Sequence, residues 1–425
     1  MWKFPETRSE TAFEDYKAPY DAQQAAAEAS RCLYCYDAPC IKACPTGIDI
    51  PNFIRKIATG NVKGSAKTIF SSNILGASCA RVCPVEVLCV GDCVYNDAGI
   101  PPIQIGRLQR YATDQAVAQD WRFFEAGPDT GKRVALIGAG PASLAAAHEL
   151  RRLGHAVTIY EKGSVPGGLN VTGVAPYKLR AEDAMAELDW VRGIGGMEIV
   201  LNTEVGRDVS WDALTAAHDA VFLGIGLGPD RLLPGADLEG VEGAVAWIER
   251  MKLGNVDLSA VRRAAVVGGG NTAVDVVREL LGLGVPHVTM VYRGTEARMS
   301  GYAHEWEAAK KEGAHAVWNA APAGFAGDGR VTAVRCQGPE GAFEVPADLV
   351  LLAIGQTKLG EHLAALGIQA DGGRVVVGDD GATSRPGWFA GGDLANGGKE
   401  VVNAVAEGKR AAAGIHAFLT GGGHA

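Results

Sequence analysis

The sequence predicts an α/β protein in which two parallel-sheet domains follow a small α-helical module. Eight of the nine cysteines lie between Cys32 and Cys93, in a region of short polar segments. A pattern of buried strand, glycine turn, helix and second strand begins at Arg133. The same pattern returns about 130 residues later, at Arg262, and such an internal repeat indicates two copies of one supersecondary unit.

The composition limits the classes of protein to which the chain can belong. Its 425 residues suggest roughly three domains. With 40 basic and 49 acidic side chains, the net charge of −9 argues against a general nucleic-acid binder. The start, MWKFPETRSE, has no apolar signal region, and no run of about 18 uncharged apolar residues occurs. We therefore expect a soluble, cytoplasmic protein.

Local sequence signals predict the first helix, a linker and the domain boundaries. Residues 21–31 (DAQQAAAEASR) predict a helix, and prolines directly follow Cys44 and Cys83. The stretch EAGPDTGK predicts a linker. We predict an α-helical domain over residues 1–126, a first sheet domain in two parts over 127–233 and 356–425, and a second sheet domain over 234–355.

The first glycine loop is typical of dinucleotide binding. Gly138, Gly140 and Ser143 form G-x-G-x-x-S directly after a predicted strand over 134–137. Small residues there let backbone N–H groups and a helix N-terminus approach a pyrophosphate. Glu161 ends the next strand, where a carboxylate can accept hydrogen bonds from ribose hydroxyls. We expect three further residues of this unit to join the site, namely Pro141, Gly168 and Leu169.

The second glycine loop differs in its charge. Gly268 and Gly270 follow a predicted strand over 264–267, and we expect Asn271 and Thr272 to join them in binding. At the position that matches Glu161 stand Tyr292 and Arg293, with Arg298 close behind. Arginines there favour a 2′-phosphate, and so NADPH, although two solvated loop arginines are the alternative. The two loops therefore predict Rossmann-like domains for two nucleotides, FAD on the first and NAD(P) on the second.

A third glycine-rich segment supports the flavin assignment. In GGDLANGG, Gly392 and Asp393 follow a predicted buried strand and precede a predicted helix. Flavoproteins with two dinucleotide-binding domains bring an aspartate to the FAD ribityl chain at such a turn. The alternative is an ordinary turn capped by an aspartate.

The clustered cysteines predict a metal centre. The sets are Cys32-x2-Cys35-x4-Cys40-x3-Cys44-Pro and Cys79-x3-Cys83-Pro-x4-Cys89-x3-Cys93. Disulfides need an export route that the sequence does not predict, and zinc sites usually show two C-x2-C pairs where only one exists here. The spacing favours iron–sulfur clusters, with structural zinc or no metal as alternatives. Because only Cys336 lies beyond Cys93, the flavin domain has no redox cysteine pair, and clusters are the available exit for its electrons.

Several stretches resemble one known family. They are EASRCLYCYDAPCIKACPTGIDIPNFIRKI, CARVCPVEVLCVGDCV, IGRLQRYAT, GAGPASLAA and GGGNTAVDV. They are similar to the PreT family of electron-transfer subunits of bacterial dihydropyrimidine dehydrogenase, and to the N-terminal half of the animal enzyme. More distant relatives are the small subunit of glutamate synthase and the large subunit of the NADH-dependent ferredoxin:NADP oxidoreductase.

The resemblance implies two [4Fe-4S] clusters and a set of four ligands for each. One cluster would take Cys32, Cys35, Cys40 and Cys93, and the other Cys44, Cys83, Cys89 and Gln109, which leaves Cys79 as a spare thiol. A glutamine in the segment IGRLQ is the mark of the dihydropyrimidine branch, whereas the glutamate synthase branch has a glutamate there. The resemblance also implies FAD contacts at Val82 and Lys178. Family members of the PreT type use NADH, while the arginines favour NADPH, and both donors stay open.

The resemblance also implies a function and a partner. Electrons would pass from NADH or NADPH through FAD and two clusters to a PreA-like FMN and iron–sulfur subunit, which reduces uracil or thymine to 5,6-dihydropyrimidines. Nothing in the 425 residues resembles an FMN-binding barrel, so we expect a hetero-oligomer, and we name no general acid or base in this chain. The alternatives are an electron-supplying subunit of glutamate synthase or of a ferredoxin-linked complex, and a zinc-containing nucleotide-responsive scaffold.

Overall fold

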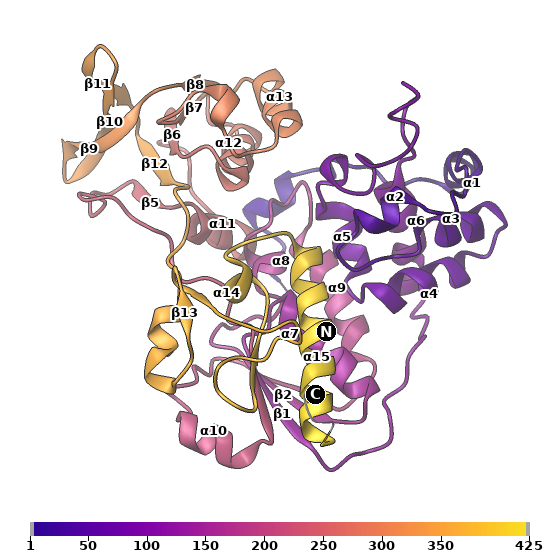
Figure 1. The fold of residues 1–425 in the computed structure, drawn as a ribbon. Helices are drawn as coiled ribbons and strands as arrows, with labels where there is room; N and C mark the ends of the chain where they lie inside the picture. The colour runs from indigo at the N-terminus through magenta and orange to yellow at the C-terminus, as the bar shows by residue number, and fades with distance from the viewer. Residues whose placement is uncertain (1–3, 422–425) are drawn as a thin grey trace.

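The computed structural model describes residues 4–421, which form three parts that lie side by side (Figure 1). An α-helical module comes first in the chain. Its helices are α1 (Ala22–Ser30), α2 (Pro39–Lys42), α3 (Ile50–Ala58), α4 (Val62–Ser72), α5 (Gly76–Val82) and α6 (Ile105–Ala118). The helix predicted within residues 21–31 is confirmed as α1.

Local sequence explains why these helices start and pack as they do. Asp21 caps α1 by accepting a hydrogen bond from the backbone N–H of Gln24, whose side chain bonds back to the N–H of Asp21. In α3 the apolar residues Ile50, Phe53, Ile54 and Ile57 recur at helical spacing, and all are buried. These residues belong to a hydrophobic core that continues from the module into the first sheet domain.

The first sheet domain is a parallel five-stranded sheet of order β15-β4-β1-β2-β3. The strands β1 and β15 confirm the two strands predicted before Gly138 and Gly392. The sheet strands are β1 (Arg133–Ile137), β2 (Ala156–Tyr160), β3 (Met197–Val200), β4 (Ala220–Leu223) and β15 (Trp388–Ala390), and the helices are α7 (Pro141–Arg152), α8 (Leu169–Thr172), α9 (Ala181–Arg192), α10 (Trp211–Ala217), α14 (Asp393–Asn396) and α15 (Val401–Leu419).

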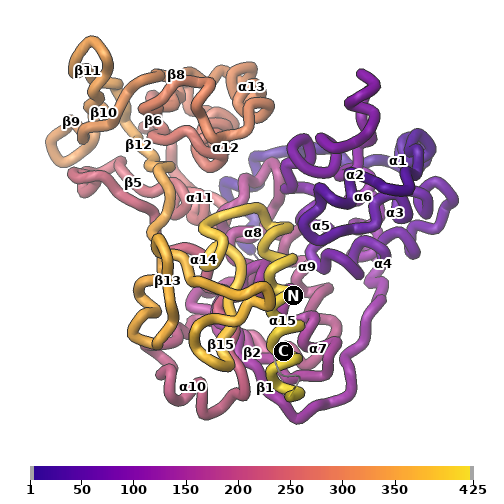
Figure 2. The backbone as a smooth tube through the Cα atoms, in the orientation of Figure 1, coloured from indigo at the N-terminus to yellow at the C-terminus, as the bar shows by residue number. Residues whose placement is uncertain are grey.

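The second sheet domain is inserted between β4 and β15. The chain leaves the first sheet after β4 and returns to it after β12. Figure 2 shows the returning segment, which runs from β12 to β13 (Ala370–Asp371). Its parallel sheet has the order β5-β12-β6-β7-β8. The strands are β5 (Val241–Gly243), β6 (Arg263–Val267), β7 (His287–Val291), β8 (His315–Val317) and β12 (Leu349–Leu352), and the helices are α11 (Ala244–Leu253), α12 (Asn271–Gly282) and α13 (Ala303–Lys311).

One sheet in this domain was not predicted. The strands β9 (Ala321–Asp328), β10 (Arg330–Gly338) and β11 (Gly341–Pro346) form an antiparallel sheet. A short pair, β13 (Ala370–Asp371) and β14 (Arg374–Val375), lies in the segment that returns to the first domain. Cys336 is buried within β10. The remaining short turns of 3-10 helix are η1 (Ser9–Ala12), η2 (Val85–Val87), η3 (Glu296–Arg298) and η4 (Gly360–Leu366).

An N-terminal segment, residues 8–16, crosses all three parts. The Glu10 carboxylate accepts a hydrogen bond from the N–H of Ala181 in the first sheet domain, at 2.8 Å. Phe13 packs in the core of the second sheet domain, against Gly282. The Asp15 carboxylate pairs with Arg110 of the helical module at 2.8 Å. This segment therefore ties the three parts to one another.

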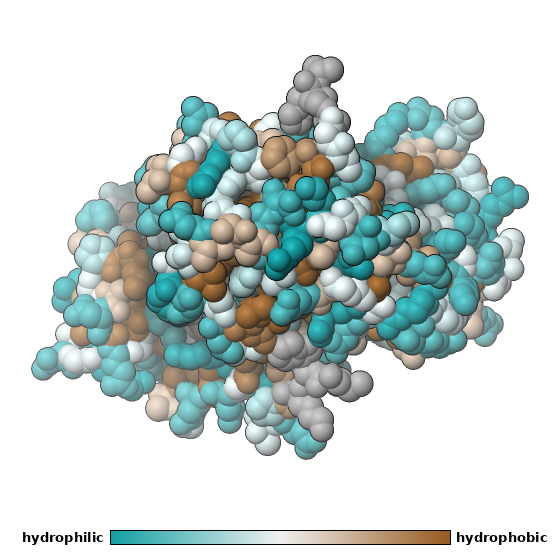
Figure 3. All heavy atoms as spheres, turned by 90° about the horizontal axis from the view of Figure 1, so that it is seen from below, coloured by the Kyte–Doolittle hydropathy of each residue, from teal (hydrophilic) through white to brown (hydrophobic). Residues whose placement is uncertain are grey.

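The hydropathy of the surface and the length of the helices both bear on contact with a membrane. On the face shown in Figure 3, hydrophilic residues are interspersed with smaller hydrophobic patches. Over residues 4–421, the structure contains no helix with both the length and the apolar character needed to span a bilayer.

A buried histidine on α7 gives a pH-dependent prediction. Burial, together with the smaller effects of the Arg152 and Lys409 cations, lowers the pKa of His148 to about 3. Because the unfolded chain binds this proton near pH 6.5, the stability that neutral His148 contributes is complete above that pH. It falls by about 2 kcal/mol between pH 6.5 and 5. In urea unfolding at these two pH values, His148→Gln should lose less stability than the wild type.

A control keeps this prediction specific to the buried site. His287 is exposed at the start of β7, so His287→Gln should keep the wild-type difference between the two pH values. The same loss in His148→Gln as in the wild type would contradict the assignment.

Candidate functional site

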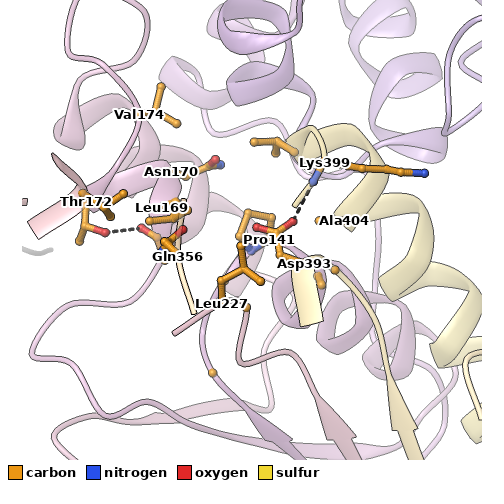
Figure 4. Close-up of a pocket in the computed structure, with 18 of the residues that line it drawn as sticks. Pro141, Leu169, Asn170, Thr172, Val174, Leu227, Gln356, Asp393, Lys399 and Ala404 are labelled. Carbon is orange, nitrogen blue, oxygen red and sulfur yellow. Dashed lines mark hydrogen bonds between the residues drawn. The ribbon is translucent and has the colours of Figure 1, made fainter. Parts of the chain in front are cut away.

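A cavity of about 630 Å³ lies where the three parts meet. This volume is in the range of sites for cofactors and drug-sized ligands. Figure 4 shows Pro141, Leu169 and Asp393 projecting toward it from the first sheet domain. Of the residues that sequence reasoning assigned to cofactor binding, those that line it are Val82, Gly138, Gly140, Pro141, Glu161, Gly168, Leu169, Lys178, Asn271, Gly392 and Asp393.

The first glycine loop exposes its backbone to this cavity. Gly138 has φ +87°, and a Cβ there would lie 2.6 Å from the carbonyl oxygen of Gly224. Gly140 is the N-cap of α7, and a Cβ on it would meet no atom within 4 Å. The loop therefore turns tightly at Gly138 and leaves open space at Gly140, in front of a twelve-residue helix N-terminus. This arrangement fits a pyrophosphate group.

Glu161 is held at the end of β2 beside this loop. Its carboxylate accepts hydrogen bonds from the N–H groups of Ala139 at 2.8 Å and Gly163 at 2.7 Å. Both contacts fix the carboxylate at the cavity wall, where its remaining lone pairs fit ribose hydroxyls. The cavity thus suits the dinucleotide that the sequence predicts.

Ser143 does not line the cavity. It is fully buried on α7, and its hydroxyl has no hydrogen-bond partner. A Cβ on Gly224 would lie 2.1 Å from the Ser143 Oγ atom. The third position of the motif is therefore small because the helix packs closely against the end of β4.

Gly392 and Asp393 line the cavity from the turn that follows β15. The N–H of Gly392 donates to the Glu407 carboxylate at 2.7 Å, and the Asp393 carboxylate accepts from the N–H of Lys399 at 3.3 Å (Figure 4). Burial raises the pKa of Asp393. The turn is thus tied to α15 through Glu407 and to the segment before α15 through Lys399, and it presents a partly buried carboxyl group to the cavity.

The far wall of the cavity carries a network of buried charges. The Lys178 Nζ atom lies 2.8 Å from Asp275 and 2.7 Å from Glu305, which belong to α12 and α13 of the second sheet domain. Burial alone would lower the pKa of Lys178, but these two carboxylates raise it. Nearby, the Tyr302 hydroxyl donates to Glu400 at 2.6 Å. These contacts join the two sheet domains across the cavity.

The second glycine loop reaches the cavity only through Asn271. The Asn271 side-chain oxygen accepts a hydrogen bond from the N–H of Tyr302 at 3.0 Å. Gly268 is confined by the carbonyl oxygen of Ala353, which a Cβ would approach to 2.3 Å. Five residues that the sequence assigned to the second nucleotide site lie outside the cavity wall, namely Gly268, Gly270, Thr272, Arg293 and Arg298.

Arg293 and Arg298 lie beyond the end of β7, and both are exposed. Within residues 4–421, no carboxylate forms a salt bridge with either guanidinium. Two free guanidinium groups close to a dinucleotide loop suit a phosphate more readily than two arginines already paired with acids would.

The predicted cluster ligands gather in two adjacent groups of thiols. Burial raises the pKa of Cys40 to about 12, and the thiols of Cys32, Cys93 and Cys35 add to the rise. The same four cysteines line one small pocket with apolar walls. They come from the loop before α2, from α2 itself and from the turn after η2, and the structure brings the four thiols together. That they hold one cluster stays a prediction.

The second group contains Cys44, Cys83 and Cys89. The pKa of Cys83 is raised well above its usual value, first by the neighbouring Cys79 thiol, then by burial and by Cys89 and Cys44. Burial raises the pKa of Cys89 to about 12, and Cys44 and Cys40 add to it. Cys89 therefore lies within electrostatic reach of both groups.

The donor chemistry of both groups fits iron–sulfur clusters. Thiols that raise one another's pKa are close together, and bound iron would relieve this repulsion by taking the place of the protons. Within residues 4–421, no three His, Cys, Asp or Glu side chains surround a single point as ligands of one ion do. A four-iron cube is wider than one ion and needs its thiolates farther apart.

The fourth ligand of the second group has two candidates. Gln109 is buried on α6, and its side-chain N–H donates to the Gly76 carbonyl oxygen at 2.7 Å. That bond leaves the amide oxygen as the atom that could ligate iron. Cys79 is the thiol next to Cys83. The assignment of Gln109 in preference to Cys79 stays a prediction.

Sequence reasoning missed several residues of the cavity. They come from all three segments of the sheet domains, and they include Asn170, Leu227, Asp275, Tyr302, Gln356 and Glu400. The side-chain N–H of Gln356 donates to the carbonyl oxygen of Gly228 at 2.9 Å. This bond joins the two segments that connect the sheet domains, one after β4 and one after β12. Only Asp275 lies in a stretch that the sequence analysis singled out, GGGNTAVDV, and contacts between segments far apart in the chain bring all of these residues together.

Comparison with known proteins follows the same division of the chain. Residues 8–121 match a family described as dihydropyrimidine dehydrogenase domain II, 4Fe-4S cluster. Residues 132–408 match the pyridine nucleotide-disulphide oxidoreductase family. The chain belongs to the pyridine nucleotide-disulphide oxidoreductase family. This pyridine nucleotide-disulphide oxidoreductase carries the iron–sulfur domain at its N-terminal side.

Two curated relatives of this oxidoreductase align over nearly the whole chain. The NAD-dependent dihydropyrimidine dehydrogenase subunit PreT of Escherichia coli strain K12 is 38% identical, over 93% of this chain and 94% of the relative. The glutamate synthase [NADPH] small chain of the same strain is 36% identical, over 96% and 94%. The resemblance stated from the sequence is therefore confirmed.

Solved structures show the same fold for the two sheet domains. FprA from Mycobacterium tuberculosis in complex with NADPH has a TM-score of 0.59 at 19% identity, over 69% of this chain and 85% of that one. Thioredoxin reductase of Lactococcus lactis has a TM-score of 0.54 at 23% identity, over 68% and 99%. The predicted fold class, an α-helical iron–sulfur domain followed by Rossmann-like domains, is confirmed.

These findings set the biochemical class of the chain. It is an NAD(P)H-dependent flavin oxidoreductase with an iron–sulfur domain, an electron-transfer subunit of the PreT or glutamate synthase small chain type. FAD and NAD(P)H are the cofactors of the oxidoreductase domain, and the N-terminal domain is of the 4Fe-4S type.

Proposed function

We propose that this chain oxidises NAD(P)H through FAD and passes electrons through two [4Fe-4S] clusters to a partner subunit that reduces uracil or thymine. The partner would be PreA-like, with FMN and iron–sulfur centres, and the complex a hetero-oligomer. The similarity to a protein named as a dihydropyrimidine dehydrogenase subunit supports this substrate class, as does the match of residues 8–121. The presence of Gln109 on α6 supports it too, since the resemblance connects a glutamine there with the dihydropyrimidine branch.

The observation that carries the electron path is the position of α5. Val82, its last residue, lines the 630 Å³ cavity, and Cys83, the next residue, belongs to the second thiol group. When bound, FAD accepts a hydride from a nicotinamide and releases single electrons, which iron–sulfur clusters accept one at a time. The cavity wall and the second thiol group are thus joined by the single peptide bond between Val82 and Cys83, at the end of α5.

The other residues named above have binding roles in this proposal. The first glycine loop and Glu161 hold the pyrophosphate and a ribose of FAD, and Asp393 faces its ribityl chain. Cys32, Cys35, Cys40 and Cys93 hold one cluster, while Cys44, Cys83, Cys89 and Gln109 hold the other. Lys178, Asn271 and Tyr302 border the space between the flavin side and the nicotinamide side of the cavity.

A second candidate function is electron supply to glutamate synthase. The 36% identity to a glutamate synthase small chain supports it. Both candidates share the same electron path and differ only in the partner and in the final acceptor. An assay of the final acceptor therefore separates them.

The decisive experiment is to purify the chain anaerobically together with whatever binds it. Iron, acid-labile sulfide and flavin are measured first, and then uracil-dependent oxidation of NADH and NADPH. Uracil-dependent turnover supports the first candidate, and glutamine- and 2-oxoglutarate-dependent turnover supports the second. Zinc without iron or sulfide would overturn both and select a scaffold.

The choice of nicotinamide gives a specific prediction. If Arg293 and Arg298 bind a 2′-phosphate, the double variant Arg293→Ala, Arg298→Ala should raise the KM for NADPH by about tenfold or more, since charge-assisted hydrogen bonds to phosphate contribute about 1.5–3 kcal/mol. The KM for NADH should stay within about twofold. Flavin reduction by each donor measures both values. Arg207→Ala, at an exposed salt bridge with Glu204 and Asp208, is the control. Equal effects on both donors would show that the two arginines do not select NADPH.

A further inference from the structure

The carboxylate of Glu187 joins the flavin-binding domain to the helix α5 of the iron–sulfur domain. Glu187 lies on α9 and is 1% exposed. Its two oxygens accept hydrogen bonds from the backbone N–H groups of Ala77 at 2.6 Å and Ser78 at 2.9 Å, and from the Ser78 hydroxyl. One buried side chain thus satisfies the N–H groups that begin α5, which have no partner within the helix.

The rest of α5 is held from several sides. The carbonyl oxygen of Gly76 accepts from the Gln109 side chain at 2.7 Å. Arg81 is buried, pairs with Asp114 of α6 at 2.7 Å, and lies 3.7 Å from Asp183, which is also on α9. Glu187 and Asp183 are therefore the two acidic contacts through which α9 fixes the position of this helix.

The position of α5 matters because of what it carries. The helix has seven residues, ends at Val82 on the wall of the cavity, and leads directly to Cys83 of the second thiol group. A shift of its first turn would be transmitted to both places, since a hydrogen-bonded helix of about two turns is stiff. Such a shift would change the separation between the flavin side and the thiol side of the site.

We propose that Glu187 is a positioning residue for electron transfer, which fixes α5 so that the flavin cavity and the second thiol group keep one separation. The inference rests on the proposed function, because it needs a flavin in the cavity and a cluster on Cys83. Electron tunnelling falls steeply with distance, whereas hydride transfer from a nicotinamide occurs on the other side of the cavity. Loss of the Glu187 contacts therefore slows the step from flavin to cluster and spares the step before it.

The test compares Glu187→Gln with Asp189→Asn in the full chain loaded with flavin and clusters. The glutamine keeps one acceptor oxygen but turns an NH2 group toward the N–H of Ser78, which breaks the pair of bonds. Asp189 is on the same helix, 32% exposed, and pairs with Arg192 at 3.4 Å, so its change to asparagine is a matched loss of one charge.

Three measurements distinguish positioning from a general loss of stability. Rapid mixing with NADH or NADPH should show flavin reduction within about twofold of the wild type in both variants. Cluster reduction after it should slow by about tenfold or more in Glu187→Gln only, in line with the sensitivity of such steps to displacements of about 1 Å. The electron paramagnetic resonance signal of the reduced second cluster should change shape in the same variant. Amide hydrogen exchange of Ala77 and Ser78 should also become faster.

Each outcome decides the inference. Cluster reduction at the wild-type rate in a folded Glu187→Gln overturns it, as does equal slowing in Asp189→Asn. If Glu187→Gln does not fold, Ser78→Ala replaces it, because this variant loses only the hydroxyl contact. Ser78→Ala should slow the same step to a smaller extent, and an unchanged rate overturns the inference. Wild-type protein without flavin or iron would instead overturn the proposed function.

Discussion

Replacing Cys89 with alanine is expected to lower the iron and acid-labile sulfide of the purified chain and to stop electron delivery beyond the flavin. Burial, with the thiols of Cys44 and Cys40, raises the pKa of Cys89 to about 12, so Cys89 lies near a thiol of each group. A cluster that loses one of four ligands loses affinity as well as its proper potential. Partner-dependent oxidation of NAD(P)H should fall by about 100-fold or more, while flavin content stays unchanged.

Cys336 offers the matched control for this variant. It is also a buried thiol, but it lies in β10 of the second sheet domain, away from the other eight. Cys336→Ala should keep full iron, sulfide and partner-dependent activity. Iron and sulfide that stay at the wild-type level in Cys89→Ala would remove Cys89 from the ligand set.

The second large effect is expected for Lys178→Met. Lys178 is 13% exposed and neutralises two carboxylates, Asp275 and Glu305, which are 14% and 10% exposed. Methionine keeps the length of the side chain but leaves both acids without their cation. Removing one partner of a buried ion pair costs about 3–5 kcal/mol, because the charges that remain are still poorly solvated. Chemical unfolding of the chain should show this loss.

Lys310 supplies the control, because it too contacts two carboxylates. Its partners are Glu296 at 2.8 Å and Glu307 at 2.7 Å, but its side chain is 37% exposed. Solvent screens such a pair, so Lys310→Met should cost about 0–1 kcal/mol. Similar losses in the two variants would show that burial does not set the strength of the Lys178 pairs.

The elements that could be predicted from the sequence are those that local patterns specify. The strands β1 and β6 are buried apolar runs that end in a glycine turn, and α15 is a long segment of good helix formers. The sheet β9 to β11 could not be predicted with the same ease. Its strands have mixed burial, and they form by pairing with one another more than by their own pattern.

The candidate site shows the same division. The glycine loop, Glu161 and the cysteine sets are short-range motifs, and the structure brings their members together at the cavity and in the two thiol groups. Glu187 belongs to no motif, and Asp275 lies in GGGNTAVDV, which does not reveal its partner. Their partners lie about 100 residues away in the chain, at Ala77 and Lys178, so only the folded protein reveals them.

The segment of residues 8–16 has a consequence for how the protein is made. Its contacts reach Ala181 and Gly282, so this segment cannot complete its packing until residue 282 has left the ribosome. During synthesis the cysteine loops follow it closely, long before either of these partners has been made. The segment would therefore be among the last parts of the molecule to reach its final position, although it is made before all the parts that it joins.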